Sequence, residues 1–313
     1  MERSVYEDKN FREKLKDAAT SMKVGSVWNP GNVVGPMITN GNDKLLKALE
    51  LEQGESWLVP PQFLDKNKYV LAPTVKWGVR PGSYSFRTEL FGPMLSVVCI
   101  ENLQQGIELV NSLDYGLTSG LQSLDEEEQR LWKNSIMAGN LYINRGITGA
   151  IVNRQPFGGM KLSAFGGEKA RGPNYCACFV KISDKPGSTT DYKQSYPKAY
   201  EQEFAHARDI NNLYGEQNVF RYLPLRNMVL RLFPGDTNED AQMIAFAAKI
   251  CHTPLTISFE PGDDRTTALA SLGCSLKKES LQEFLKSMSE YERIRTCGED
   301  IPMEMYEGAA RTD

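Results

Sequence analysis

The chain has 313 residues, 41% of them hydrophobic, which suits two ordinary domains or one large α/β domain, so a globular fold is expected. Its 36 basic and 40 acidic side chains give a net charge of −4 without a long basic run, which argues against nucleic acid or an anionic membrane surface as a partner. The apolar runs at residues 94–100 and 243–250 are too short to span a membrane, and the charged first ten residues lack a signal-peptide core. A cytoplasmic location is therefore expected.

Helical and strand-like patterns alternate along the first part of the chain. Apolar residues at helical spacing predict a helix over residues 6–22, with Gly25 after its end. A loop rich in Gly, Asn and Pro follows. The elements predicted after this loop are a short helix at 43–51, a strand at 68–79, a buried strand at 94–100, helices at 103–113 and 126–136, and a short strand at 139–145.

A polar stretch at residues 183–212, which contains Pro186 and Pro197, predicts a tether between two domains at 1–182 and 213–313. After it, a strand at 227–233, a helix at 241–253 and a strand at 254–259 predict a βαβ unit. Thr237 and Asp240 have the spacing of a capping box at the start of this helix, and a further amphipathic helix is expected at 280–294. The second domain therefore reads as a smaller, Rossmann-like α/β unit.

Two stretches carry candidate binding residues. In "TELFGPMLSV", Glu89 and Phe91 would project to one side of an extended segment, where a carboxylate suits a ribose diol and a ring suits a flat heterocycle. The alternative is a glutamate at a strand entry beside a core phenylalanine.

In "GITGAIVNRQPFGG", Gly149 lets a ligand approach its own N–H and that of Ala150, and successive N–H groups in a turn form a nest for an anion such as a carboxylate. Phe157 would cover the aliphatic part of the same ligand. The alternative is an ordinary turn into a strand.

The six cysteines are too sparse for a disulfide scaffold, and their spacings match no common zinc pattern. Cys176 and Cys178 lie two residues apart in a strand-like run and are interpreted as structural thiols, so no metal site is predicted. His206, in a polar helix, and His252, at a helix end, are not expected to be catalytic.

Six motifs in order resemble the second half of the aldehyde dehydrogenase superfamily over residues 1–182. They are "KVGSVWNPGNVVGPMI", "LAPTVKW", "ELFGPMLSV", "LDYGLTSGL", "LYINR" and "RQPFGGMKLSAFGGEKARGPNY". The T-G-A followed by QPFGG and GPNY is most similar to the 1-pyrroline-5-carboxylate dehydrogenase branch, which oxidises L-glutamate γ-semialdehyde. A second α/β unit behind it resembles the long, bifunctional proline utilization A proteins.

The resemblance implies a partial aldehyde dehydrogenase catalytic subdomain followed by a smaller Rossmann-like domain. It assigns Glu89 and Phe91 to NAD, and Gly149, Ala150 and Phe157 to the aldehyde substrate. It places the nucleophilic cysteine, the general base and the nucleotide-binding sheet before residue 1, and FAD only in an upstream proline dehydrogenase domain. The isolated chain is thus expected to lack catalytic residues and activity.

A small-molecule substrate, the missing N-terminal half and further copies of the chain are the partners that the resemblance implies. Two other hypotheses stay open. One is a non-catalytic scaffold or interaction module that retains the fold, and the other is half of a general aldehyde dehydrogenase with an unrelated second domain. Affinity for glutamate separates the first of these from the enzyme fragment.

Overall fold

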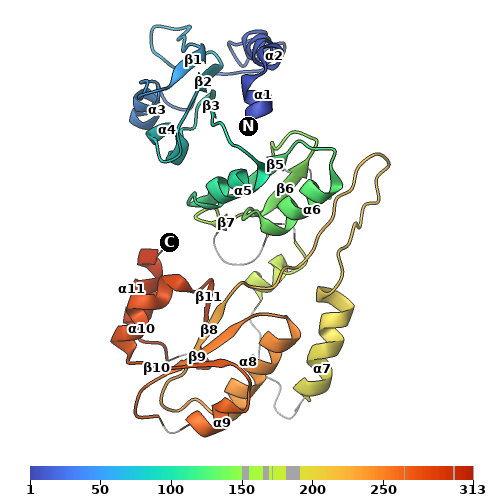
Figure 1. The fold of residues 1–313 in the computed structure, drawn as a ribbon, viewed down its shortest axis with the longest axis vertical. Coiled ribbons are helices and arrows are strands. Elements are labelled where there is room, and N and C mark those ends of the chain that lie inside the picture. The colour runs from blue at the N-terminus through green and yellow to red at the C-terminus, as the bar shows by residue number, and fades with distance from the viewer. Residues whose placement is uncertain are drawn as a thin grey trace. The chain divides into compact units, whose positions relative to one another are not determined.

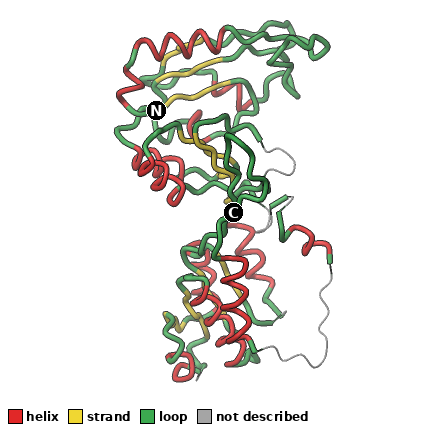
Figure 2. Tube along the Cα trace, turned by 90° about the vertical axis from the view of Figure 1, so that its right-hand side faces the viewer, coloured by secondary structure: helices red, strands yellow, loops and turns green. Residues whose placement is uncertain are grey.

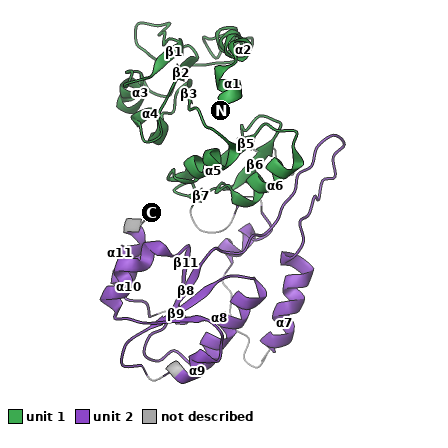
Figure 3. Cartoon of the chain, in the orientation of Figure 1, with its two compact units in different colours: residues 1–149, 158–167 green, residues 150–157, 168–313 purple. Residues whose placement is uncertain are grey.

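The computed structural model describes residues 1–149, 155–164, 169–170, 172–180, 191–263, 265–298 and 300–312. Contacts divide the chain into two compact units, coloured separately in Figure 3. The N-terminal unit comprises residues 1–149 and 158–167, and the C-terminal unit comprises 150–157 and 168–313. The change of unit lies before the boundary predicted at residue 182, because residues such as Asn174, which donates to Tyr222 Oη at 3.4 Å, contact the C-terminal unit. None of the described helices is long and apolar enough to cross a membrane.

The N-terminal unit is a mixed α/β structure (Figure 1). Its helices are α1 (Arg3–Glu7), α2 (Lys9–Thr20), α3 (Asp43–Ala48), α4 (Tyr84–Arg87), α5 (Leu103–Asn111) and α6 (Glu126–Ser135). Its strands are β1 (Ser56–Val59), β2 (Thr74–Trp77), β3 (Met94–Val97), β4 (Tyr115–Gly116), β5 (Thr118–Leu121), β6 (Asn140–Ile143) and β7 (Met160–Lys161).

The first helix predicted in this unit, over residues 6–22, is divided in two at Asp8. The Asp8 side chain accepts hydrogen bonds from the backbone N–H groups of Asn10 and Phe11, so it ends α1 and caps the start of α2. Helix α2 packs against the sheet β1-β2-β3, in which β2 is antiparallel to β1 and parallel to β3. Here Tyr6 stacks on Trp77 with ring centroids 4.5 Å apart.

Strand β3 differs from its prediction as a fully buried strand, because Leu95 is 48% exposed. The strand lies at the edge of its sheet, and only some of its side chains reach the core. Two smaller sheets complete the unit: an antiparallel pair of β4 with β7, and a parallel pair of β5 with β6.

The C-terminal unit carries a parallel sheet with helices alongside (Figure 2). Its strands are β8 (Met228–Arg231), β9 (Leu255–Phe259), β10 (Ser275–Lys278) and β11 (Arg293–Arg295). Its helices are η1 (Tyr175–Phe179), α7 (Tyr192–Ala199), η2 (Tyr200–Phe204), α8 (Asn238–Ile250), α9 (Thr266–Ala270), α10 (Leu281–Ser287), η3 (Met288–Glu290) and α11 (Met303–Thr312).

The parallel order β10-β9-β8-β11 confirms the predicted βαβ unit and the Rossmann-like α/β class. Side chains alternate along β8: Leu230 packs in a core with α8, whereas Val229 packs with Phe284 of α10 on the other face. The predicted capping box of Thr237 and Asp240 is present at the start of α8.

The segment predicted as a polar tether, residues 183–212, is helical over Tyr192–Phe204, and its residues 183–190 lie outside the described residues. Asp191 caps α7, and the rings of Tyr192 and Tyr196 lie 5.7 and 6.3 Å from the ring of Phe246 on α8. The tyrosines recur at helical spacing and bury aromatic surface against a neighbouring helix, which a compositional reading of this polar stretch did not detect.

Candidate functional site

Glu89 and Phe91 lie in the connection between α4 and β3. Between them, the carbonyl oxygen of Leu90 accepts a hydrogen bond of 3.1 Å from Asn42 Nδ2, which fixes the connection to the start of α3. Phe91 has φ of 48°, a left-handed conformation that aromatic residues rarely adopt, and its side chain is 73% exposed. Glu89 is exposed as well. An exposed ring held in a strained backbone conformation is typical of a functional segment.

The expectation that Glu89 and Phe91 project to the same side depended on an extended backbone. The backbone leaves the extended region at Phe91, so the alternation of side chains along a strand does not apply there. The next residue packs tightly: a Cβ added to Gly92 would lie 2.7 Å from Leu45 Cδ2, so position 92 has no room for a larger side chain.

Gly149 follows strand β6, in a turn at the carboxyl end of the parallel pair β5 and β6. Its φ of 76° is left-handed, and a Cβ built on it would meet nothing within 4 Å, so the backbone is open to a ligand. Its N–H donates to Ile147 O at 3.2 Å, which closes a three-residue turn. The N–H group therefore already has an acceptor within the turn, and a ligand would have to share it.

Two contacts hold the start of this turn. Asn144 Nδ2 donates to Ser123 O at 2.8 Å, and Ser123 N–H donates back to Asn144 Oδ1 at 3.0 Å. Gly120 of β5 leaves room for the Ile147 side chain, because a Cβ added to Gly120 would lie 2.4 Å from Ile147 Cγ2. These contacts hold the turn against strand β5 and the residues directly after it.

Tyr142 provides a third contact that sequence reasoning missed. Its side chain is 3% exposed, and its hydroxyl donates to Gly149 O at 2.7 Å. Alternation along β6 could have indicated the burial of Tyr142, since Asn140 and Tyr142 are both buried. The hydrogen bond from the Tyr142 hydroxyl to the carbonyl of Gly149, seven residues later, could not be predicted from sequence spacing.

For the other two predicted substrate residues, the structure does not test a place beside this turn. Ala150 lies outside the described residues. Phe157 belongs to the C-terminal unit, where its N–H and C=O pair with Ala170 O and N–H, both at 3.0 Å. Its side chain is half-buried.

The cysteines differ from their prediction. Cys176 and Cys178 lie in a short 3-10 helix rather than in a strand, because residues Tyr175–Phe179 form i to i+3 hydrogen bonds, and both cysteines are exposed. Burial raises the pKa of the Cys251 and Cys274 thiols. Burial, aided by nearby carboxylates, raises the pKa of Cys297 to about 11. A raised thiol pKa opposes nucleophilic attack near neutral pH.

No group of three or more His, Cys, Asp or Glu side chains that could hold a metal is present in the described part of the chain. His252 follows the end of α8, as predicted, and its ring meets that of Tyr200 edge-on at 5.8 Å.

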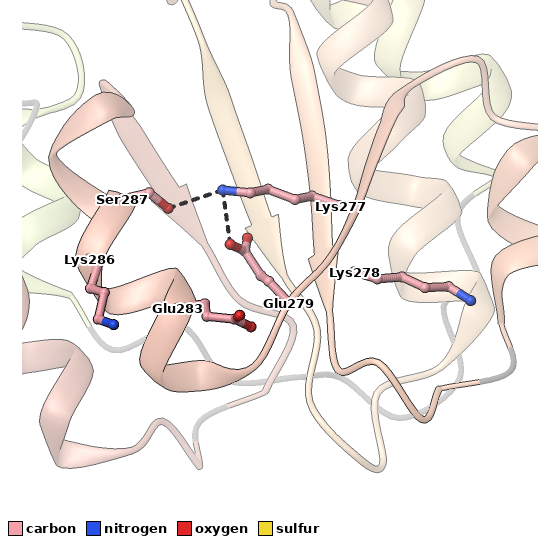
Figure 4. Close-up of a pocket in the computed structure, with 6 residues that line it drawn as sticks. All are labelled: Lys277, Lys278, Glu279, Glu283, Lys286 and Ser287. Atoms are coloured by element: carbon pink, nitrogen blue, oxygen red, sulfur yellow. Dashed lines mark hydrogen bonds and ion pairs between the residues drawn. The ribbon is translucent and has the colours of Figure 1, made fainter.

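A hollow of about 380 Å³ lies beside β10 and α10 in the C-terminal unit (Figure 4). Lys277 Nζ points toward Glu279 Oε2 at 2.9 Å and Ser287 Oγ at 3.2 Å, whereas Lys278 points away from them. Glu283 accepts the N–H of Ser280 in a capping box. None of the residues that line the hollow is a predicted substrate residue, so the hollow is not the predicted substrate site.

Glu279, which lines this hollow, also accepts a hydrogen bond from the buried Arg231. Arg231 Nη1 donates to Ser258 Oγ and to Glu279 O, both at 2.9 Å, and Nη2 pairs with Glu260. Ser258 Oγ donates to Glu279 Oε1 at 2.7 Å. The sequence "NMVLRLF" contains Arg231 but does not indicate its partners, so the network could not be predicted. A buried charge is tolerated in a core when it is paired and hydrogen-bonded.

Residues 1–184 match the model of the aldehyde dehydrogenase family. The chain belongs to this family. It is 32% identical to 1-pyrroline-5-carboxylate dehydrogenase of Bacillus licheniformis over 184 residues, 57% of this chain and 36% of that protein. Identity to the Bacillus subtilis enzyme of the same name is 32% over 165 residues, 52% of this chain and 32% of that protein. This chain therefore spans about one third of the length of these curated relatives.

Solved structures extend the similarity beyond residue 184. Proline utilization A from Corynebacterium freiburgense matches with 34% identity and a TM-score of 0.71, over 87% of this chain and 32% of that chain. Proline utilization A from Bdellovibrio bacteriovorus matches with 29% identity and a TM-score of 0.52, over 60% of this chain and 20% of that chain. The first match reaches into the C-terminal unit, and the predicted resemblance is confirmed.

Proposed function

We propose that this chain forms the C-terminal part of an NAD-dependent 1-pyrroline-5-carboxylate dehydrogenase, which oxidises L-glutamate γ-semialdehyde to glutamate in proline catabolism. The names of the homologous proteins support the reaction. The observation that carries the substrate assignment is the open, left-handed turn at Gly149, at the carboxyl end of β5 and β6. Ligands of open α/β sheets bind at this end of parallel strands.

In this proposal the turn binds the carboxylate that distinguishes glutamate γ-semialdehyde from a simple aldehyde. The N–H groups of Gly149 and Ala150 donate to the carboxylate, and Phe157 covers the aliphatic chain. Arg145 lies exposed in the same turn, so its positive charge favours an anionic ligand. The substrate is thus held by backbone N–H groups, which bind a carboxylate without a dedicated cationic side chain.

Glu89 and Phe91 are proposed to bind NAD, which supplies the hydride acceptor of the reaction. The exposed carboxylate of Glu89 can accept hydrogen bonds from two ribose hydroxyls. The exposed ring of Phe91 offers a flat apolar face to the nicotinamide. Both residues orient the cofactor and take no part in bond making.

The isolated chain is proposed to be inactive, because the family's nucleophilic cysteine and general base have no counterpart among the residues that match its later motifs. The alternative is a scaffold module that retains the fold. The raised pKa values of Cys251, Cys274 and Cys297 agree with both proposals, since neither uses these three thiols for attack. In a scaffold the Gly149 turn has no ligand.

Binding of L-glutamate to the purified chain, measured by NMR titration, tests the substrate assignment. We expect weak binding that Gly149→Val abolishes, because a branched side chain blocks the approach to the backbone. Gly215→Val is the matched control: Gly215 has φ of 82° and nothing within 4 Å of an added Cβ, so backbone strain is similar but the site is remote in sequence. Equal binding of glutamate and of butyramide, a neutral analogue without a carboxylate, or no binding of glutamate, would contradict the proposal. Formation of NADH from glutamate γ-semialdehyde by the chain alone would contradict its inactivity.

A further inference from the structure

We infer that Asn42 is a positioning residue for the cofactor, because its side chain holds Phe91 in the backbone conformation that presents an exposed ring. The inference rests on the proposed function, since it adds to Glu89 and Phe91 a residue that itself touches no ligand. It predicts that affinity for the nicotinamide half of NAD depends on an amide group at the start of helix α3.

The side-chain amide of Asn42 makes two hydrogen bonds, one as acceptor and one as donor. Its Oδ1 accepts the N–H of Leu45 at 2.7 Å, which caps the start of α3. Its Nδ2 donates to the carbonyl oxygen of Leu90 at 3.1 Å. An amide offers the acceptor and the donor on one planar group, whereas a carboxylate offers acceptors alone. Asn42 therefore joins a helix cap to the segment that carries Glu89 and Phe91.

The hydrogen bond to Leu90 acts directly on Phe91, because the bonded carbonyl and the N–H of Phe91 belong to one planar peptide group. The direction of this carbonyl defines one side of the φ angle of Phe91. That angle is 48°, in the left-handed region that residues with a Cβ occupy at a cost in energy. A strained conformation of this kind persists where its surroundings hold it. With this backbone, the ring of Phe91 is 73% exposed.

The chain after Phe91 is anchored as well. Gly92 lies so close to the buried side chain of Leu45 that an added Cβ would be 2.7 Å from Leu45 Cδ2. The carbonyl oxygen of Pro93 accepts the N–H of Thr74, on strand β2, at 2.9 Å. Since the chain is held after Phe91, fixing the carbonyl before it determines its φ. The start of α3 thus contacts the chain on both sides of the strained residue.

Asn42→Asp separates this role from helix capping. Aspartate caps a helix about as well as asparagine and still accepts the N–H of Leu45, but it has no donor for the carbonyl of Leu90. Asn102→Asp is the matched control. The Asn102 side chain caps α5 by accepting the N–H of Gln105 at 3.0 Å, so the control makes the same change of charge at another capped helix of the same unit.

The first measurement needs no ligand. By NMR, the coupling between the amide and α protons of Phe91 reports its φ, and hydrogen exchange at the Leu45 amide reports the helix cap. In Asn42→Asp we expect the Phe91 coupling to rise toward that of an extended residue, while the Leu45 amide keeps its wild-type protection. Asn102→Asp is expected to change neither quantity.

The second measurement is the affinity of the full chain for nicotinamide mononucleotide, the half of NAD that carries the nicotinamide ring. Asn42→Asp is expected to raise its Kd by about three- to tenfold, the effect of one hydrogen bond. Phe91→Ala is expected to raise the Kd as well. In the Phe91→Ala background, Asn42→Asp should change the Kd by less than about twofold, because it acts through the ring that is already absent.

The outcomes distinguish the inference from the proposed function. An unchanged Phe91 coupling in Asn42→Asp overturns the positioning role. A loss of affinity that persists in full in the Phe91→Ala background also overturns it, since that pattern indicates repulsion between the new carboxylate and the phosphate of the ligand. If the wild-type chain does not bind nicotinamide mononucleotide, the cofactor role in the proposed function fails, and the Phe91 coupling alone decides whether Asn42 holds this segment.

Discussion

Lys76→Met is expected to destabilise the N-terminal unit by about 3 kcal/mol, because it leaves a buried carboxylate without its cation. Lys76 Nζ lies 2.9 Å from Glu55 Oε2 and 2.6 Å from Glu50 O, and both side chains of the pair are 1% exposed. Breaking a buried ion pair from one side costs about 3–5 kcal/mol. In the variant, Glu55 keeps a 2.8 Å hydrogen bond from the N–H of Glu52. The expected loss of stability is therefore at the lower end of this range.

The double variant Lys76→Met/Glu55→Gln is expected to recover most of this loss, to within about 1 kcal/mol of the wild type. Glutamine has no charge to bury and still offers an oxygen to the N–H of Glu52. The recovery distinguishes an unpaired charge from a packing defect, because methionine is present in both variants.

Urea unfolding followed by tryptophan fluorescence measures this unit alone. All four tryptophans lie in it, at positions 28, 57, 77 and 132. Lys44→Met, at an exposed lysine of α3, is the control and should change stability by less than about 0.5 kcal/mol. A loss below about 1 kcal/mol for Lys76→Met, or a double variant no more stable than the single one, would refute the reasoning.

Three further predictions concern the C-terminal unit. Arg231→Met should destabilise it by about 2 kcal/mol, because the Glu260 carboxylate loses its cation and the buried Ser258 Oγ and Glu279 carbonyl oxygen each lose a donor. Faster hydrogen exchange along β8 would show this loss, and unchanged exchange would contradict it. Iodoacetamide should alkylate exposed Cys176 well before Cys297 near neutral pH, because burial raises the pKa of Cys297 to about 11; equal rates by mass spectrometry would count against this. Hydrogen bonds from backbone N–H groups, that of Asn218 first, hold the pKa of Asp209 below its ordinary value of 3.8. The stability that this carboxylate gives its loop is therefore fully present above pH 3.8 and is lost as the pH falls through the lowered pKa, which NMR titration of Asp209 checks.

The sequence predicted elements where one strong periodicity or cap decided the local structure. The βαβ unit around α8 follows from two apolar strands and the Thr237 cap, and the structure confirms both. Short strands such as β4, β7 and β11 were missed, because two or three residues carry no readable period. Helix α7 was missed because its stability comes from Tyr192 and Tyr196 packing on Phe246, a tertiary contact that polar composition conceals.

The residues of the candidate site stay a prediction from motif order, and their geometry could be predicted only in part. Motif order identified Glu89, Phe91 and Gly149, and the structure leaves all three open to solvent. The assumption of an extended backbone at Phe91 was wrong, because Phe91 has a left-handed φ of 48° that alternation rules cannot anticipate. The hydroxyl of Tyr142 could not be predicted, since a hydrogen bond that closes a loop depends on the path of the chain between its ends.

The chain passes between its two compact units three times, since residues 150–157 belong to the C-terminal unit and residues 158–167 return to the N-terminal one. No cut at a single peptide bond can therefore release both units complete, because every cut leaves part of one unit attached to the other. A gene encoding either unit alone would need a deletion and a new junction as well as a shortened end. Recombination at a single point in the gene therefore cannot replace one complete unit by a homologous unit, so the two units are inherited together.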